Sequence, residues 1–213
     1  MKLFSPDSKF MIAMSRLADL ILLNFLFLIT CIPLFTVGAA STALYTVAFR
    51  IGTIRETGVI KPYFRAFRDN FRQATILWLL LVLGGGCAVF DITLFYGMNS
   101  LLRYLFIPFA ILLILILFAV SVAFPLLSQF NNSTKQTVLN ALFLSVGYLP
   151  RTLLVTAMNL FPFAVFACNM LLFFQTSFMW VFLYFSVSAY FGALLLKGAF
   201  KPFMEAENQE EEA

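Results

Sequence analysis

The fold is decided by residues 17–49, which read LADLILLNFLFLITCIPLFTVGAASTALYTVAF. As one helix, this predominantly apolar stretch would be roughly 50 Å long at about 1.5 Å per residue. The hydrocarbon core of a bilayer is only about 30 Å thick. Pro33 breaks a helix and Gly38 permits a turn. We therefore expect two short helices, about Leu17–Ile32 and Gly38–Phe49, that form a hairpin around these two residues.

The composition places the rest of the chain in a membrane as well. The 213 residues are 62% hydrophobic and 11% charged, whereas soluble domains carry about 25% charged residues. Disorder is excluded too, because it requires low hydrophobicity. Further apolar segments, each long enough for a spanning helix of about 20 residues, occupy residues 74–96, 104–127, 152–174 and 175–196. The sequence predicts an all-α, polytopic transmembrane helix bundle of about six helices.

The basic residues orient this bundle, because Lys and Arg favour the cytoplasmic side of a membrane. If the N-terminus is cytoplasmic and residues 17–49 enter the bilayer and return, every Lys and Arg except Arg103 is cytoplasmic. Both termini then lie on that side, and residues 17–49 are either two full spans or a re-entrant pair. We expect residues 1–204 to form a single transmembrane domain and residues 205–213, rich in Glu, to form an acidic disordered tail.

Patterns for catalysis and metal binding are missing from the sequence. The chain contains no His, the commonest general base and transition-metal ligand, and it carries no Walker A, GxSxG, HExxH or dinucleotide-binding motif. Cys31, Cys87 and Cys168 form no CxxC pair, and we expect them to be buried small hydrophobes. The net charge of +4 reflects the cytoplasmic bias of the basic residues and not nucleic-acid binding. We predict a non-enzymatic protein without a cofactor or metal.

Residues 61–73 predict an amphipathic helix at the cytoplasmic surface, leading into the next span. One face of the helical wheel carries three aromatic residues, and the adjacent face carries four basic residues. The aromatic residues are Phe64, Phe67 and Phe71, and the basic residues are Lys61, Arg65, Arg68 and Arg72. Two interpretations stay open, an anchor on the anionic lipid of the bilayer and a docking surface for a partner protein.

A second polar loop on the cytoplasmic side spans residues 128–137. Within it, Ser133 or Thr134 is suited to cap a helix that runs from about Lys135 towards Tyr148. Elsewhere, Asn24, Asn159 and Gln175 interrupt apolar segments. These three side chains either line a polar path through the bundle or join helices by hydrogen bonds.

Four stretches of the sequence carry a family resemblance. They are SPDSKF at residues 5–10, SRLADL at 15–20, IPLFTVGAASTALY at 32–45 and YFRAFRDNFRQA at 63–74. They resemble the YesL-type family of bacterial integral membrane proteins, a family of unknown function. The resemblance implies a bacterial cell membrane. Family members are often encoded beside carbohydrate-uptake ABC transporter genes, which implies an ABC-type sugar transporter or a membrane regulator as partner. No catalytic residue can be carried over from this family.

Two functions follow from these observations. The first is a non-enzymatic accessory or regulatory protein of carbohydrate uptake, which binds its partner through residues 61–73 and the loop 128–137. The second is a small-solute facilitator whose neutral polar path contains Asn24, Asn159 and Gln175.

Overall fold

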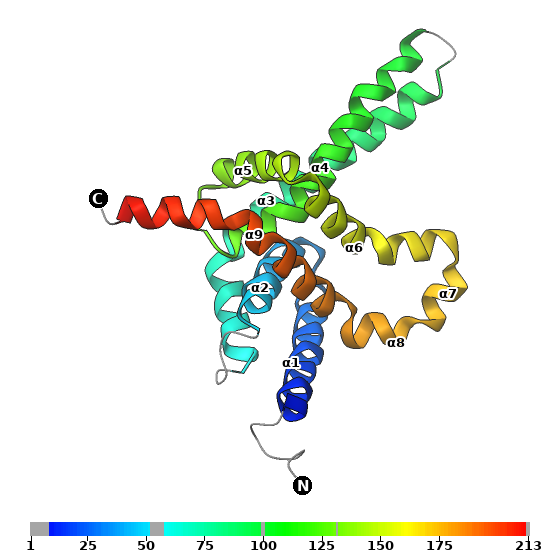
Figure 1. The fold of residues 1–213 in the computed structure, drawn as a ribbon. Coiled ribbons are helices and arrows are strands. Elements are labelled where there is room, and N and C mark those ends of the chain that lie inside the picture. The colour runs from blue at the N-terminus through cyan, green and yellow to red at the C-terminus, as the bar shows by residue number, and fades with distance from the viewer. Residues whose placement is uncertain (1–8, 52–57, 99–100, 131, 212–213) are drawn as a thin grey trace.

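The computed structural model describes residues 9–51, 58–98, 101–130 and 132–211, and these residues are almost entirely helical (Figure 1). The α-helices are α1 Lys9–Thr30, α2 Val37–Arg50, α3 Ile60–Tyr96, α4 Phe106–Leu127, α5 Thr134–Gly147, α6 Leu149–Cys168, α7 Met170–Gln175, α8 Ser177–Met179 and α9 Phe185–Glu211. Two short 3₁₀ turns, η1 Leu34–Thr36 and η2 Leu101–Leu105, and a π-helix, η3 Trp180–Tyr184, complete the described elements. The prediction of an all-α fold is confirmed.

Five helical stretches in the described part of the chain are long and apolar enough to cross a membrane. They are Phe10–Thr30, Ile60–Tyr96, Leu101–Leu127, Leu149–Cys168 and Ser177–Lys201. The sixth apolar segment of the sequence forms α2, which has 14 residues and is therefore about 21 Å long. That length is short of a hydrocarbon core of about 30 Å. The described helices fit a multi-pass integral membrane protein with five long apolar helical stretches, beside which α2 is too short to span the bilayer.

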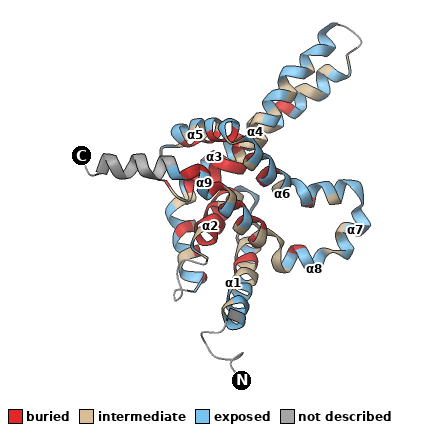
Figure 2. Cartoon of the chain, viewed as in Figure 1, coloured by how far each residue is buried: buried red, intermediate tan, exposed pale blue. Residues whose placement is uncertain are grey.

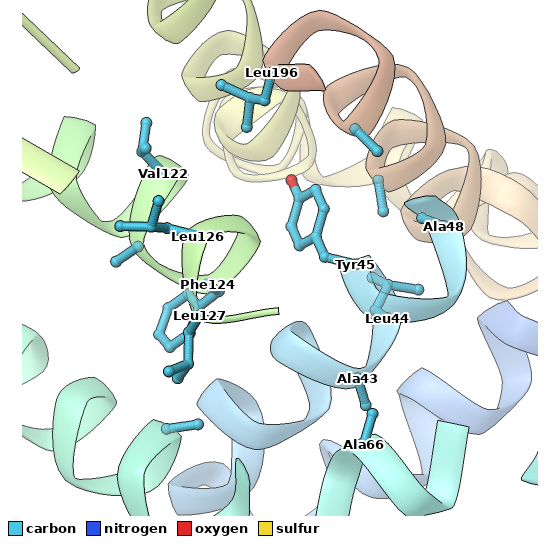
Figure 3. Packing of buried hydrophobic residues seen from close by; sticks show 14 of the residues in the cluster. Ala43, Leu44, Tyr45, Ala48, Ala66, Val122, Phe124, Leu126, Leu127 and Leu196 are labelled. Carbon is cyan, nitrogen blue, oxygen red and sulfur yellow. The ribbon is translucent and has the colours of Figure 1, made fainter. Parts of the chain in front are cut away.

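The buried core lies at the centre of the molecule and not along the whole length of the helices. Burial concentrates where α2, α3, α4, α5 and α9 meet (Figure 2). In this core, Ala43 of α2 lies beside Ala66 of α3, and Tyr45 extends from α2 towards α9 (Figure 3). The α9 residue Phe200 is 0% exposed. Its ring lies 5.9 Å from that of Phe49 and 5.8 Å from that of Phe130, between ring centroids.

Three arms extend from this core with their apolar side chains exposed. The first is the hairpin of α3 and α4, and the second is the curved succession of helices α6, α7 and α8. The third is the N-terminal part of α1 (Figures 1 and 2). Leu83 and Phe90 on the first arm, and Phe163 and Leu171 on the second, are all exposed. Soluble monomers rarely expose such extended apolar surface, so these arms fit contact with lipid.

The hairpin between α1 and α2 turns at Pro33, as the sequence predicts, and its turn rests against α3. The indole Nε1 of Trp78 donates a hydrogen bond of 2.9 Å to the carbonyl oxygen of Leu34. Gly38 lies so close to α3 that an added Cβ would overlap the Ala74 carbonyl oxygen and approach Trp78 Cβ to 2.7 Å. The absence of a side chain at Gly38 thus permits the close contact of α2 with α3.

The backbone of α9 continues to Glu211, so the helix enters the segment 205–213 that the sequence predicts to be an acidic disordered tail. The side chains of residues 202–211, and all of residues 212 and 213, lie outside the described part. The disordered character of this tail therefore stays a prediction.

Candidate functional site

The N-terminal half of α3 carries the candidate site, and α1 and α2 hold it in place. Its inner side is formed by Tyr63, Ala66 and Ala74, all buried. The Tyr63 hydroxyl and the Thr30 hydroxyl at the end of α1 share a hydrogen bond of 2.5 Å. Small residues on both helices let α2 and α3 approach closely, so this half of α3 has a fixed inner face.

Four cations project from the opposite side of the same helical segment. We call the surface formed by Lys61, Arg65, Arg68 and Arg72 the basic face, and all four residues are exposed. Within the described residues, the ion pair on this face joins Arg65 Nε to Asp69 Oδ2 at 3.7 Å, and the Arg65 side chain is still 86% exposed. Such exposed pairs contribute at most about 1 kcal/mol. The positive charge of the basic face therefore remains available to a partner.

The three aromatic residues beside the basic face divide into two groups. Phe67 and Phe71 are half-buried, with ring centroids 5.5 Å apart, and Phe67 also stacks on Tyr63. Phe64 is 47% exposed. The helical wheel thus places Phe67 and Phe71 against the core, whereas Phe64 extends the exposed surface next to Arg65 and Arg68.

Residues 61–73 continue into the apolar part of α3 without a break in the helix. The whole of α3 has 37 residues and is about 55 Å long. A span needs only about 20 residues. The basic face therefore belongs to the part of α3 that exceeds the length of one span.

The predicted loop 128–137 lies next to the basic face. The Gln73 side-chain Nε2 donates a hydrogen bond of 2.5 Å to the carbonyl oxygen of Asn132. Ser133 and Gln136 then form a capping box at the start of α5, which confirms the predicted cap, and Lys135 is exposed. The structure thus brings together the two elements in which the sequence places partner binding.

Residues 20–92 match the family model described as "Protein of unknown function, DUF624". This match confirms the resemblance to the YesL-type family over these residues. No curated protein and no solved structure matches the chain. The DUF624 segment contains the C-terminal half of α1, all of α2 and most of α3, and therefore the hairpin and the basic face together. Since the family has no known function, its name supplies no activity.

The three residues of the predicted polar path lie in different settings. Asn24, inside the DUF624 segment, is fully buried and its side chain makes three hydrogen bonds to backbone atoms of Trp180, Val181 and Ser186. Asn159 is half-buried and approaches the Tyr45 hydroxyl. Gln175 is exposed at the end of α7. The side chain of Asn24 joins helices in the described structure, and the path itself stays a prediction.

Polar atoms that the sequence did not single out are buried between α2, α6 and α9. Four of these atoms are buried without a hydrogen-bond partner. They are the hydroxyls of Tyr45, Thr152 and Ser188, and Nη1 of Arg151. Gly192 and Gly198 of α9 permit this packing, because a Cβ there would lie 3.2 Å from the Tyr45 hydroxyl and 3.1 Å from Arg151 Nη1. The only sequence signal for this group is the presence of hydroxyl residues within apolar segments.

The cysteines differ from the sequence prediction that they are buried. Cys31 is half-buried, and Cys87 and Cys168 are exposed. The last two lie on the apolar arms, where a small apolar side chain facing lipid needs no cover from other helices. Across all the residues that the structure describes, no group of three or more Cys, Asp or Glu side chains is arranged to hold a metal ion.

Proposed function

We propose that this chain is a non-enzymatic accessory or regulatory membrane protein that binds an acidic surface of a cytoplasmic partner through the basic face. The observation that carries the proposal is the exposure of Lys61, Arg65, Arg68 and Arg72 on a helical segment whose opposite side is fixed. A fixed surface loses little conformational freedom on binding, and its clustered charge steers an oppositely charged partner.

The location of the basic face supports a role outside the hydrocarbon. Because α3 exceeds the length of one span, its charged half extends towards the cytoplasm while its apolar half remains in the bilayer. Gln73 connects it to Asn132 at the base of α5. The partner would thus contact α3 together with the loop 128–137.

We propose that both termini are cytoplasmic and that α1 and α2 form a re-entrant hairpin. The turn of the hairpin contacts Trp78 through Leu34, and α3 extends roughly 27 Å beyond Trp78 at about 1.5 Å per residue. A turn at this depth does not reach the far surface. The positive-inside bias of the sequence gives the same orientation.

The link to a bacterial cell membrane and to carbohydrate uptake rests on the family resemblance. The DUF624 match supports membership of a group whose members are often encoded beside carbohydrate-uptake ABC transporter genes. An ABC-type sugar transporter or a membrane regulator is accordingly the proposed partner.

The test is purification of the tagged full chain from its native membrane in mild detergent, with quantitative mass spectrometry of the proteins that come with it. A stoichiometric membrane transporter or regulator is expected, and the variant Arg68→Glu/Arg72→Glu should recover at least tenfold less of it. The matched control is Arg103→Glu, which reverses an exposed charge at the opposite end of α3 and α4.

Two outcomes would contradict this function. One is equal recovery of the partner with the basic-face variant and with the wild type. The other is a solitary protein that by itself carries solute into proteoliposomes, since an accessory protein has no flux of its own.

A further inference from the structure

A pocket of about 220 Å³ opens between α1, α2 and α9, away from the basic face. Its wall includes the apolar side chains of Phe49, Ile51 and Leu194 together with the ring of Tyr190. Arg16 from α1 and Lys197 from α9 also line it. A wall in which apolar side chains stand beside two cations suits a ligand that is anionic at one end and apolar at the other.

In the described part of the chain, neither cation is paired with another side chain. Among the residues that the structure describes, no ion pair or hydrogen bond is formed by the side chain of Arg16 or Lys197. The nearest carboxylate along α1 is Asp19, which does not line the pocket and forms no ion pair with Arg16. Two like charges from distant parts of the chain thus face one pocket, an arrangement that an anion would stabilise.

The ends of the apolar stretches in α1 and α9 indicate that the pocket lies at the level of the lipid headgroups. Helices α1 and α9 are antiparallel, since Asn24 contacts Ser186 while Arg16 shares the pocket with Lys197. Arg16 is near the start of the apolar stretch Phe10–Thr30, and Lys197 is near the end of Ser177–Lys201. Basic pockets between helices at the cytoplasmic end of their spans are suited to anionic lipid headgroups.

We propose that this pocket binds the headgroup of an anionic phospholipid. Arg16 and Lys197 contact the phosphate, the Tyr190 hydroxyl donates to a headgroup oxygen, and Phe49, Ile51 and Leu194 contact the first apolar atoms of the lipid. The volume is below the roughly 300 Å³ at which drug-sized ligand pockets begin, so it accommodates a headgroup and not a whole lipid. This site uses none of the residues of the basic face. The lipid proposal can therefore be tested independently of the proposed protein partner.

The experiment measures the lipid that remains bound to the purified full chain. The protein is equilibrated in detergent with phosphatidylglycerol or phosphatidylcholine, and bound lipid is quantified by native mass spectrometry. The wild type is expected to retain phosphatidylglycerol preferentially. The variant Arg16→Gln/Lys197→Gln should lower this retention about 30-fold, because each basic residue near an anionic lipid surface contributes about a factor of five.

The control variant Arg65→Gln/Arg68→Gln removes the same charge from the basic face and should retain the lipid. Arg16→Lys/Lys197→Arg keeps both charges and should restore retention, so that a folding defect is recognised. Equal loss in the pocket variant and in the basic-face variant would overturn the proposal, because it would indicate diffuse attraction. A second contrary result is displacement of bound phosphatidylglycerol by glycerol phosphate as effectively as by free phosphatidylglycerol. That result would also overturn the proposal, since the ligand would then be a soluble phosphate ester.

Discussion

The side-chain oxygen of Asn24 accepts a hydrogen bond of 3.0 Å from the backbone N–H of Ser186, which joins α1 to the first turn of α9. The Asn24 amide nitrogen donates to the carbonyl oxygens of Trp180 and Val181 at 3.1 Å and 2.7 Å. Both carbonyls belong to the π-helix Trp180–Tyr184. Departures from regular α-helix leave backbone groups to be satisfied from elsewhere, and this one fully buried side chain supplies three of those hydrogen bonds.

Replacing Asn24 with Leu should destabilise the protein by about 1–3 kcal/mol, because the buried backbone groups would lose their partners. The measurement is thermal unfolding of the purified protein in detergent. Gln175→Leu is the control, since Gln175 is exposed on α7 and its replacement should leave the unfolding temperature nearly unchanged. If the two variants behave alike, Asn24 does not join α1 to α9 in the way described.

Gly38→Ala should destabilise the contact of α2 with α3. A methyl group there overlaps the Ala74 carbonyl oxygen, and such overpacking typically costs about 1–3 kcal/mol. At Gly86 of α3, an added Cβ has no neighbour within 4 Å, and Gly86→Ala should stabilise the helix by up to about 1 kcal/mol. The opposite signs are checked by unfolding both variants under identical conditions, and a gain of stability with Gly38→Ala would contradict the described packing.

The re-entrant hairpin predicts how a cysteine at its turn reacts with a membrane-impermeant maleimide. Leu34 and Leu101 are 81% and 88% exposed in the structure, so exposure alone does not distinguish them. In a variant whose three native cysteines are replaced by alanine, Leu101→Cys should be labelled from outside intact cells and Leu34→Cys should not. Equal labelling would indicate that α1 and α2 both cross the whole bilayer.

Tyr45 and Tyr63 give a matched test of buried hydroxyl groups. The Tyr63 hydroxyl is hydrogen-bonded to Thr30, so Tyr63→Phe should cost about 0.5–1.5 kcal/mol. The Tyr45 hydroxyl is buried without a partner, and Tyr45→Phe should leave stability unchanged or raise it. A clear loss with Tyr45→Phe would contradict this, and would indicate that the nearby Asn159 side chain or an ordered water satisfies the hydroxyl.

The parts of the structure that local chemistry controls could be predicted from the sequence. Pro33 ends α1, and Ser133 caps α5 together with Gln136, because both effects act within one helical turn. The spacing of Arg65, Arg68 and Arg72 likewise places them on one exposed face. The unbroken course of α3 shows that a change from charged to apolar residues near Ala74 does not end a helix.

Contacts between residues far apart in the chain could not be predicted from the sequence. The hydrogen bonds of Asn24 join it to residues 156 to 162 positions away, and no local pattern indicates such a partner. The pocket likewise needs Arg16 and Lys197 to be brought to the same place by two helices from opposite ends of the chain. The exposure of Cys87 depends on how far the arm of α3 and α4 extends beyond the core.

The position of Phe200 has a consequence for biosynthesis. This residue, close to the C-terminal end of the described side chains, is fully enclosed between Phe49 of α2 and Phe130. During translation, α2 therefore remains without this packing partner until α9 has left the ribosome. A chain that ends before α9 would have an incomplete core, in which the ring of Phe49 is exposed to the surroundings and accessible to proteases.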